Sequence, residues 1–213
     1  MRIPALRFHS SNGESRMQHQ HAQHARRLPH IHAIGRPVFI TWRLHGSLPE
    51  NRRFPETISS AGRAFLAMDR LLADAGVGPF YLRMPAIADL VVESIRHRHW
   101  TEYDLHRFVV MPNHVHILVT PIEPVCRFMH SLKRFTAREA NRRLGRTGQP
   151  FWQDESYDRL IRDDLEFESV ARYIERNPVD AGIVTEEAQF RWSSAWPIGN
   201  RPQVSNLPHD VSS

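Results

Sequence analysis

One stretch, VVMPNHVHILV over residues 109–119, constrains the fold of this 213-residue chain more than any other. Its apolar and β-branched residues predict two short strands, over 105–111 and 114–120, and the Pro-Asn pair between them predicts a tight turn. Side chains alternate between the two faces of a strand, so His114 and His116 share one face and the apolar residues that alternate with them share the other. The sequence therefore predicts a hairpin in an antiparallel sheet, with its valine-rich face against the core.

The rest of the chain mixes strand-like and helix-like patterns, which indicates an α+β fold with a mainly antiparallel sheet. In chain order we expect a strand at 38–44, helices at 56–75, 85–100 and 124–144, a strand within 151–161, and a helix at 163–177. We expect Pro178 to end that last helix, because the residue before a proline disfavours the α conformation.

The chain divides into one domain and two tails. Residues 1–27 are polar and rich in histidine and arginine, without apolar periodicity, and predict a disordered tail. Residues 28–197 predict a single domain, and residues 198–213 have the turn-prone composition of a loose tail. The single cysteine excludes an intrachain disulfide, and no apolar run approaches the ~20 residues needed to cross a bilayer. We therefore expect a cytoplasmic protein with no membrane partner.

The charge of the chain points to a polyanionic partner. The formal net charge is +5, the isoelectric point is near 10.1, and residues 124–162 alone contain nine basic and four acidic residues. On the predicted helix 124–144, Arg127, Arg134 and Arg138 fall on one stripe, as a face that binds phosphates requires. A solvated amphipathic helix gives the same pattern.

Further residues of this block suit contact with nucleic acid. Lys133 lies next to the arginine stripe, and the aromatic residues Phe151, Trp152 and Tyr157 could stack on unpaired bases. Core packing explains the three aromatic residues equally well. The candidate DNA-binding residues are Arg127, Lys133, Arg134, Arg138 and Trp152.

Two pairs of residues could carry chemistry. Imidazole nitrogens bind transition metals well, and the shared face of His114 and His116 lets both grip one divalent ion, although such a pair often arises by chance. Tyr173 and Asn177 are four residues apart on the last helix and share a face. A tyrosine oxygen can attack a phosphodiester, and the amide oxygen of Asn177 could be a third metal ligand. A tyrosine at the margin of the core and a helix-ending asparagine would show the same spacing.

Four strings occur in order along the chain: VVMPNHVHILVTP, SLKRFTAREANRRLG, FWQDESYDR and YIERNPVDAGIV. Together with the earlier string RPVFITWRLHGSLP, they resemble the REP-associated tyrosine transposases, relatives of the small single-tyrosine HUH transposases of bacterial insertion sequences. The resemblance covers residues 28–197. It is specific because the His-x-His strand, the FWQ segment and the Tyr-x-x-x-Asn-Pro helix occur together.

The resemblance implies a ferredoxin-like antiparallel sheet with packed helices, the fold of HUH endonucleases. It implies that His114, His116 and Asn177 hold a divalent metal, Mg²⁺ or Mn²⁺, and that Tyr173 is the catalytic nucleophile. The implied reaction is transesterification of single-stranded DNA near a palindromic hairpin, which leaves a 5′-phosphotyrosine and a free 3′-OH. Mg²⁺ prefers oxygen ligands, so two histidines favour Mn²⁺. Both a monomer and a homodimer fit the resemblance.

Two other functions fit parts of this pattern. A protein of the same fold could bind hairpin DNA without cutting it, although the presence of His114, His116, Tyr173 and Asn177 argues against such a loss. A metal-dependent hydrolase could use the two histidines with water as the nucleophile. A covalent protein–DNA adduct would separate the first function from both alternatives.

Overall fold

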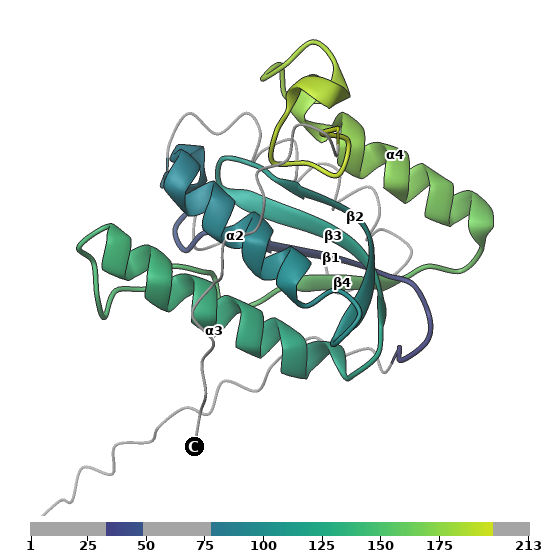
Figure 1. The fold of residues 1–213 in the computed structure, drawn as a ribbon, viewed down its shortest axis with the longest axis horizontal. Helices are drawn as coiled ribbons and strands as arrows, with labels where there is room; N and C mark the ends of the chain where they lie inside the picture. The colour runs from purple at the N-terminus through teal and green to yellow at the C-terminus, as the bar shows by residue number, and fades with distance from the viewer. Residues whose placement is uncertain (1–32, 49–77, 198–213) are drawn as a thin grey trace, which may run out of the picture.

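The computed structural model describes residues 33–48 and 78–197, which fold around a four-stranded antiparallel sheet (Figure 1). The elements, in chain order, are β1 (Val38–Arg43), α2 (Pro85–His97), β2 (Tyr103–Val110), β3 (His114–Pro121), α3 (Val125–Arg143), β4 (Tyr157–Leu160) and α4 (Asp164–Asp180). A short 3₁₀ turn, η1 (Tyr81–Arg83), precedes α2, and another, η2 (Glu187–Gln189), follows α4. The tails expected at 1–27 and 198–213 and the helix expected at 56–75 lie outside the described residues.

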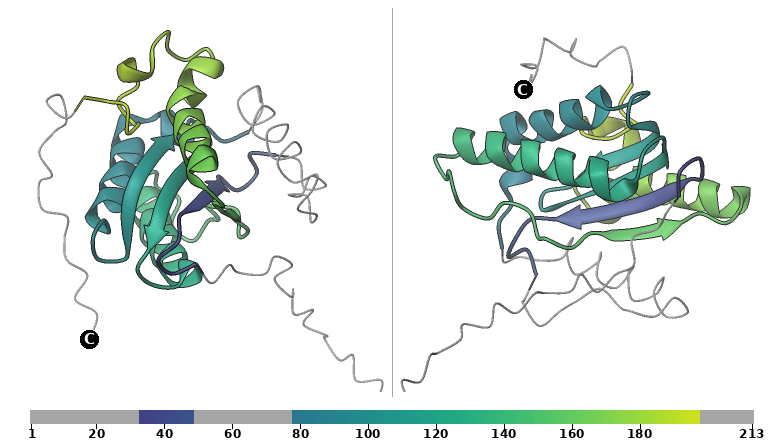
Figure 2. Two further views of the ribbon diagram at one scale, coloured as in Figure 1. Left: turned by 90° about the vertical axis from the view of Figure 1, so that its right-hand side faces the viewer. Right: turned by 90° about the horizontal axis from the view of Figure 1, so that it is seen from below.

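The order of the strands across the sheet is β2-β3-β1-β4, and every neighbouring pair is antiparallel. With α2 between β1 and β2 and α3 between β3 and β4, this is the β-α-β-β-α-β arrangement of ferredoxin-like folds. α2 and α3 lie side by side on one face of the sheet, and α4 lies on the other (Figures 1 and 2). The predicted α+β class, the ferredoxin-like sheet and the hairpin are confirmed.

The sheet carries apolar side chains on both faces, so the molecule has two cores. Val115 and Ile117 of β3 face α2 and α3 and are fully buried, as alternation along the strand predicts. On the other face, Leu118 of β3 packs in one cluster with Ile174 of α4. Burial of a side chain of this size stabilises the fold by about 1.5–3 kcal/mol, so both helical layers contribute to stability. None of the described helices is long and apolar enough to cross a membrane.

The C-terminal end of α4 differs from the prediction. Pro178 lies inside the helix, which continues to Asp180, so the expected end before the proline is wrong. A proline this close to the end disturbs a helix little, because it removes only one hydrogen bond from the last turn. The helix is instead stopped at Gly182, whose φ of 66° suits glycine, and the N–H of Ile183 donates to the carbonyl of Pro178 at 2.9 Å. Asn177 therefore lies within the helix and not at its end.

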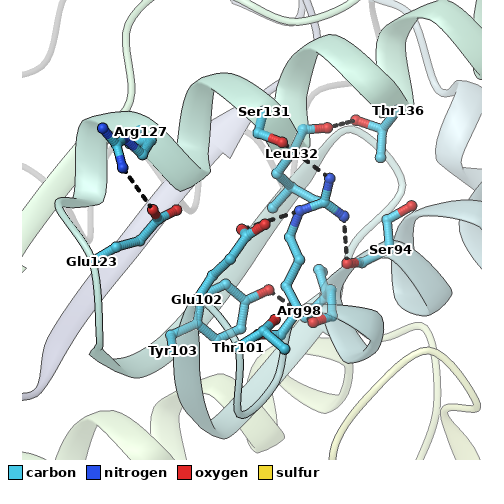
Figure 3. A network of polar contacts seen from close by, with 11 residues as sticks. Ser94, Arg98, Thr101, Glu102, Tyr103, Glu123, Arg127, Ser131, Leu132 and Thr136 are labelled. Carbon is cyan, nitrogen blue, oxygen red and sulfur yellow. Dashed lines mark hydrogen bonds and ion pairs between the residues drawn. The ribbon is translucent and has the colours of Figure 1, made fainter. Parts of the chain in front are cut away.

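A buried arginine joins the helices of the α2–α3 layer (Figure 3). Arg98, just after α2, is 8% exposed; its Nε pairs with Glu102 at 3.2 Å, and its Nη1 donates to the carbonyl of Ser94 at 2.9 Å. Its Nη2 donates to the hydroxyl of Ser131 on α3 at 3.3 Å. A buried guanidinium is tolerated only when its charge and donors have partners, so this network joins α2, the loop after it and α3.

Replacement of Arg98 by alanine should lower the free energy of unfolding by about 2–4 kcal/mol, because Glu102 and the Ser94 carbonyl lose their partner in a largely buried place. Arg127→Ala is the matched control, since it removes an exposed pair with Glu123 and should cost less than about 1 kcal/mol. Urea unfolding followed by circular dichroism measures both losses. Equal losses would contradict the role given to the buried network.

Candidate active site

The face of the sheet that α4 covers carries a band of polar side chains. In the antiparallel register, Arg43 of β1 lies opposite His114 of β3, and Thr41 lies opposite His116. Thr41 also lies opposite Tyr157 of β4. Paired residues point to the same face, so these five side chains cross three neighbouring strands. Both histidines and Thr41 are fully buried, which makes the band an interior polar surface.

Each histidine is held by a hydrogen bond at Nδ1. Nδ1 of His114 lies 2.7 Å from Oδ1 of Asn113, and Nδ1 of His116 lies 2.7 Å from Oγ1 of Thr41. Because a side-chain carbonyl only accepts, a hydrogen bond to Asn113 requires a proton on Nδ1 of His114, and in a neutral ring Nε2 is then the nitrogen that can bind a metal. Metal-binding histidines are commonly oriented in this way, by a hydrogen bond on the nitrogen that does not bind the metal. The two rings contact each other, with centroids 4.8 Å apart.

α4 brings two further residues to the histidines. Asn177 is 5% exposed, and its Nδ2 lies 3.5 Å from Nε2 of His116. The ring of Tyr173, one turn earlier, is half-buried and lies 5.7 Å from the His116 ring and 6.2 Å from the Phe39 ring. The structure thus brings together the four residues that the sequence predicts for the site, His114, His116, Tyr173 and Asn177.

Contacts on either side of Tyr173 fix the position of α4. Asp163 caps the first turn of the helix, since its side chain accepts a hydrogen bond from a backbone N–H of that turn at 2.8 Å. Two residues after Tyr173, Glu175 pairs with Arg107 of β2 at 3.0 Å and accepts a hydrogen bond from Ser194 at 3.2 Å. The tyrosine ring therefore has a defined place beside β3.

The side chains that meet here suit a divalent metal ion. Two imidazoles and one amide supply nitrogen and oxygen donors, which fit Mn²⁺ better than Mg²⁺. Within 33–48 and 78–197, no three or more His, Cys, Asp or Glu side chains are grouped to hold a metal. The amide of Asn177 lies beside His116 and is a candidate for a third ligand. Ligation by Asn177 requires its Oδ1, so the amide has to rotate from the orientation that points Nδ2 at His116. A metal held by His114, His116 and Asn177 would supply a Lewis acid to substrate oxygens.

Comparison with a known family concerns the same part of the chain. Residues 90–177 match the family model described as "Transposase IS200 like". Over this segment the chain is similar to the IS200-like transposases. It begins within α2 and ends at Asn177, so it includes both histidines and Tyr173. The match confirms the resemblance seen in the sequence.

Two further comparisons concern curated sequences and solved structures. No curated protein sequence matches it. Among solved structures, the chain is similar to one described as "Structure of the REP associates tyrosine transposase bound to a REP hairpin". That alignment has a TM-score of 0.46 and 18% sequence identity, and it covers 84% of this chain and 92% of the other.

A second tyrosine of the matched segment, Tyr157, lies in different surroundings from Tyr173. Tyr157 is 7% exposed, and its ring lies 6.5 Å from the Phe39 ring. Burial raises the pKa of its phenol, and the charge and hydrogen bond of Arg159 offset only part of this effect. A phenol with a raised pKa forms the nucleophilic phenolate less readily than an ordinary tyrosine, so Tyr157 is poorly suited to attack a phosphodiester.

The basic residues predicted to bind DNA on α3 do not lie at this site. Arg127, Arg134 and Arg138 are exposed on α3, which covers the opposite face of the sheet. Lys133 donates to the backbone carbonyls of residues 153–154, at 2.7 and 2.8 Å, and so holds the chain that leads to β4. A DNA strand that contacts both α3 and the histidines has to pass around an edge of the sheet.

Trp152 is a core residue, which contradicts the expectation that its ring could stack on a DNA base. It is 6% exposed, its ring packs edge-on against Trp42 at 6.0 Å, and its N–H donates to the hydroxyl of Thr136 at 2.9 Å. The chain after α3 folds back along the helix, and Trp152 fills the space between α3 and β1. The residue type does not reveal this, because buried and base-stacking tryptophans look alike in a sequence.

The structure adds residues that the sequence did not connect with the site. Thr41 and Arg43 alternate with apolar residues in FITWR, and this period of two was the available signal that they share a face.

An open groove of about 410 Å³ also runs along α4, lined by Leu165, Glu168, Ser169, Arg172, Tyr173, Arg176 and Asp180. Arg172 and Arg176 follow the helical repeat and place two cations beside Tyr173.

The raised pKa of Tyr157 predicts an effect on stability at high pH. A group whose pKa is higher in the folded protein stabilises the fold below its unfolded pKa of about 10, and this contribution is lost as the pH rises through the folded pKa. The unfolding free energy of the wild type should fall above about pH 10, and it should fall less steeply for Tyr157→Phe.

Urea unfolding at increasing alkaline pH measures this difference between the two proteins. Tyr103 is also buried and has a raised pKa, but it is present in both proteins, so its contribution cancels. Parallel pH profiles for wild type and Tyr157→Phe would contradict the buried environment described for Tyr157.

Proposed function

We propose that this protein cuts and rejoins single-stranded DNA near a palindromic hairpin, with Tyr173 as the nucleophile. The observation that carries the proposal is the meeting of Tyr173 and Asn177 of α4 with His114 and His116 of β3. These residues are far apart in the sequence, and folding is required to bring them together. The match to IS200-like transposases over the same residues supports the proposal.

The proposed chemistry exchanges one phosphodiester for another. The hydroxyl oxygen of Tyr173 attacks the phosphorus, a bond between them forms, and the bond between phosphorus and the 3′-oxygen breaks. The phenol loses its proton and the departing 3′-oxygen gains one, so the products are a 5′-phosphotyrosine and a free 3′-OH. The reverse attack by a 3′-OH rejoins a strand and releases the tyrosine.

The residues around the nucleophile supply position and charge. A divalent ion, Mn²⁺ or Mg²⁺, held by the two histidines and Asn177 polarises the phosphate when bound. Asn113 and Thr41 orient the two imidazoles through their Nδ1 atoms. The phenol of a free tyrosine has a pKa of about 10, so attack at neutral pH depends on such assistance.

The groove along α4 offers a path for the DNA strand. Arg172 and Arg176 line it next to Tyr173, and contacts from such residues to phosphates contribute much of the affinity for nucleic acid. The exposed arginines of α3 form a second basic surface on the opposite layer. We propose that the groove holds the strand to be cut and that α3 contacts another part of the DNA.

The alternative functions make different demands on Tyr173. A protein that binds hairpin DNA without cutting it needs no tyrosine at the histidines, and a hydrolase uses water in its place. The half-buried ring of Tyr173, 5.7 Å from the His116 ring, favours cleavage by the tyrosine over both alternatives.

Tyr173→Phe should abolish the covalent adduct with hairpin-bearing single-stranded DNA and leave DNA binding intact, because only the attacking oxygen is removed. Tyr157→Phe is the matched control and should still form the adduct, since its phenol is buried. A denaturing gel of protein incubated with labelled DNA and Mn²⁺ measures the adduct. An adduct in Tyr173→Phe, or its loss in Tyr157→Phe, would show that the assigned nucleophile is wrong.

Thr41→Val should weaken Mn²⁺ binding by about 10-fold or more, because His116 loses the hydrogen bond that orients it. His116→Ala removes the ligand itself and should weaken binding further. Thr136→Val is the control, since that hydroxyl is equally buried and donates to the Leu132 carbonyl, but in the α3 layer. Calorimetric titration with Mn²⁺ gives the affinities. Wild-type affinity in Thr41→Val would refute orientation of the site through Thr41.

A further inference from the structure

Arg43 is a buried cation beside the candidate site. It is 6% exposed and lies opposite His114 in the register of β1 and β3, on the face that α4 covers. A guanidinium stays charged in proteins, and a charge in such a place is costly unless its donors have partners. Burial accordingly lowers the pKa of Arg43, and the charge of Glu155 offsets part of this effect.

The described residues provide hydrogen-bond partners for only some of the N–H donors of the Arg43 guanidinium. Nη1 of Arg43 donates to the hydroxyl of Ser47 at 3.2 Å, and Nε is buried with no hydrogen-bond acceptor among the described residues. Among the residues that the structure describes, no carboxylate forms an ion pair with Arg43. Arg98, which is similarly buried on the opposite face, pairs with Glu102. Among the described residues, Arg43 therefore lacks the carboxylate partner that Arg98 has.

Because Arg43 lies beside two candidate metal ligands, we expect its partner to be an anion. A divalent cation bound by His114 and His116 and a guanidinium from the neighbouring strand repel each other, and the repulsion is strong where water is scarce. An anion that contacts both cations offsets this repulsion. The planar guanidinium binds phosphate oxygens well, because its donors match their geometry.

We propose that Arg43 binds the phosphodiester that Tyr173 attacks and stabilises the charge that develops on its non-bridging oxygens. The inference rests on the proposed function, and it adds a catalytic residue on β1 to those on β3 and α4. Donors that are in place before the reaction, and that act on the developing charge, speed such transfers by about 10²–10³-fold.

A purely structural role for Arg43 has different consequences. Its bond to Ser47 would then serve to hold the turn after β1, and its loss would weaken folding and metal binding together. A phosphate-binding role predicts opposite effects. Removal of a cation next to the histidines should leave the Mn²⁺ affinity of the DNA-free protein unchanged or higher, while the cleavage rate falls.

The experiment compares two variants of Arg43 with a matched control. Arg43→Gln removes the charge. Arg43→Lys keeps the charge but loses the planar guanidinium, which can donate to two phosphate oxygens at once. Arg98→Gln is the control, because it removes a buried guanidinium from the opposite face of the sheet. Each full-length protein is measured for its rate of adduct formation with hairpin DNA and for its Mn²⁺ affinity without DNA. A third measurement, independent of cleavage, is the broadening of the ³¹P signal of dimethyl phosphate by protein-bound Mn²⁺.

We expect Arg43→Gln to form the adduct about 100-fold more slowly or slower still, to bind Mn²⁺ at least as tightly as the wild type, and to lose most of the broadening. Arg43→Lys should keep part of the rate, and Arg98→Gln should keep the full rate. A rate for Arg43→Gln within about threefold of the wild type overturns the inference and leaves the proposed function standing. Parallel losses of rate and Mn²⁺ affinity in both Arg43 variants also overturn it, in favour of a structural role.

Failure of the proposed function is recognised separately. If the wild type forms no adduct with hairpin DNA, the broadening measurement still decides the role of Arg43. Broadening that is lost in Arg43→Gln supports a phosphate site beside the histidines, and equal broadening in both proteins overturns it. If Arg43→Gln does not fold, Arg43→Lys takes its place in each comparison, with a smaller expected loss.

Discussion

The pairing of β1 with β3 determines where the polar groups of the site lie. Its register sets Thr41 beside His116 and Arg43 beside His114. A slip of one residue would turn either the two β1 residues or the two histidines to the opposite face of the sheet. Such a slip is opposed because both faces are buried, and large side chains such as Trp42 fill the core on the α2–α3 side. The positions of the candidate metal ligands therefore depend on apolar packing on the far side of the sheet.

α4 both covers this polar face and completes the site. Its apolar residues pack on the sheet in one cluster, while Tyr173 and Asn177, one turn apart, meet the histidines. Because α4 excludes much of the water, each electrostatic contact beneath it is stronger than it would be at the surface. The outer groove of the same helix reaches Tyr173, so a strand bound along α4 arrives at the site without disturbing the core.

Local patterns in the sequence were enough to predict the hairpin and the two shared faces. The period of two in HVHILV places the histidines together, and helical spacing places Tyr173 with Asn177. Pairing between distant strands has no local signal, so neither Thr41 nor Arg43 could be connected with the histidines. The ferredoxin-like topology followed from the family resemblance and not from periodicity. Trp152 shows the same limit, because composition does not reveal which helix covers an aromatic side chain.

Tandem mass spectrometry of the wild-type adduct tests the central claim most directly. Trypsin cleaves after Arg172 and Arg176, so Tyr173 lies on a short peptide with no other tyrosine, whereas Tyr157 lies on the peptide that ends at Arg159. After digestion with nuclease and trypsin, we predict a nucleotide joined through its 5′-phosphate to Tyr173. A nucleotide on Tyr157, or on any residue other than Tyr173, would contradict the account.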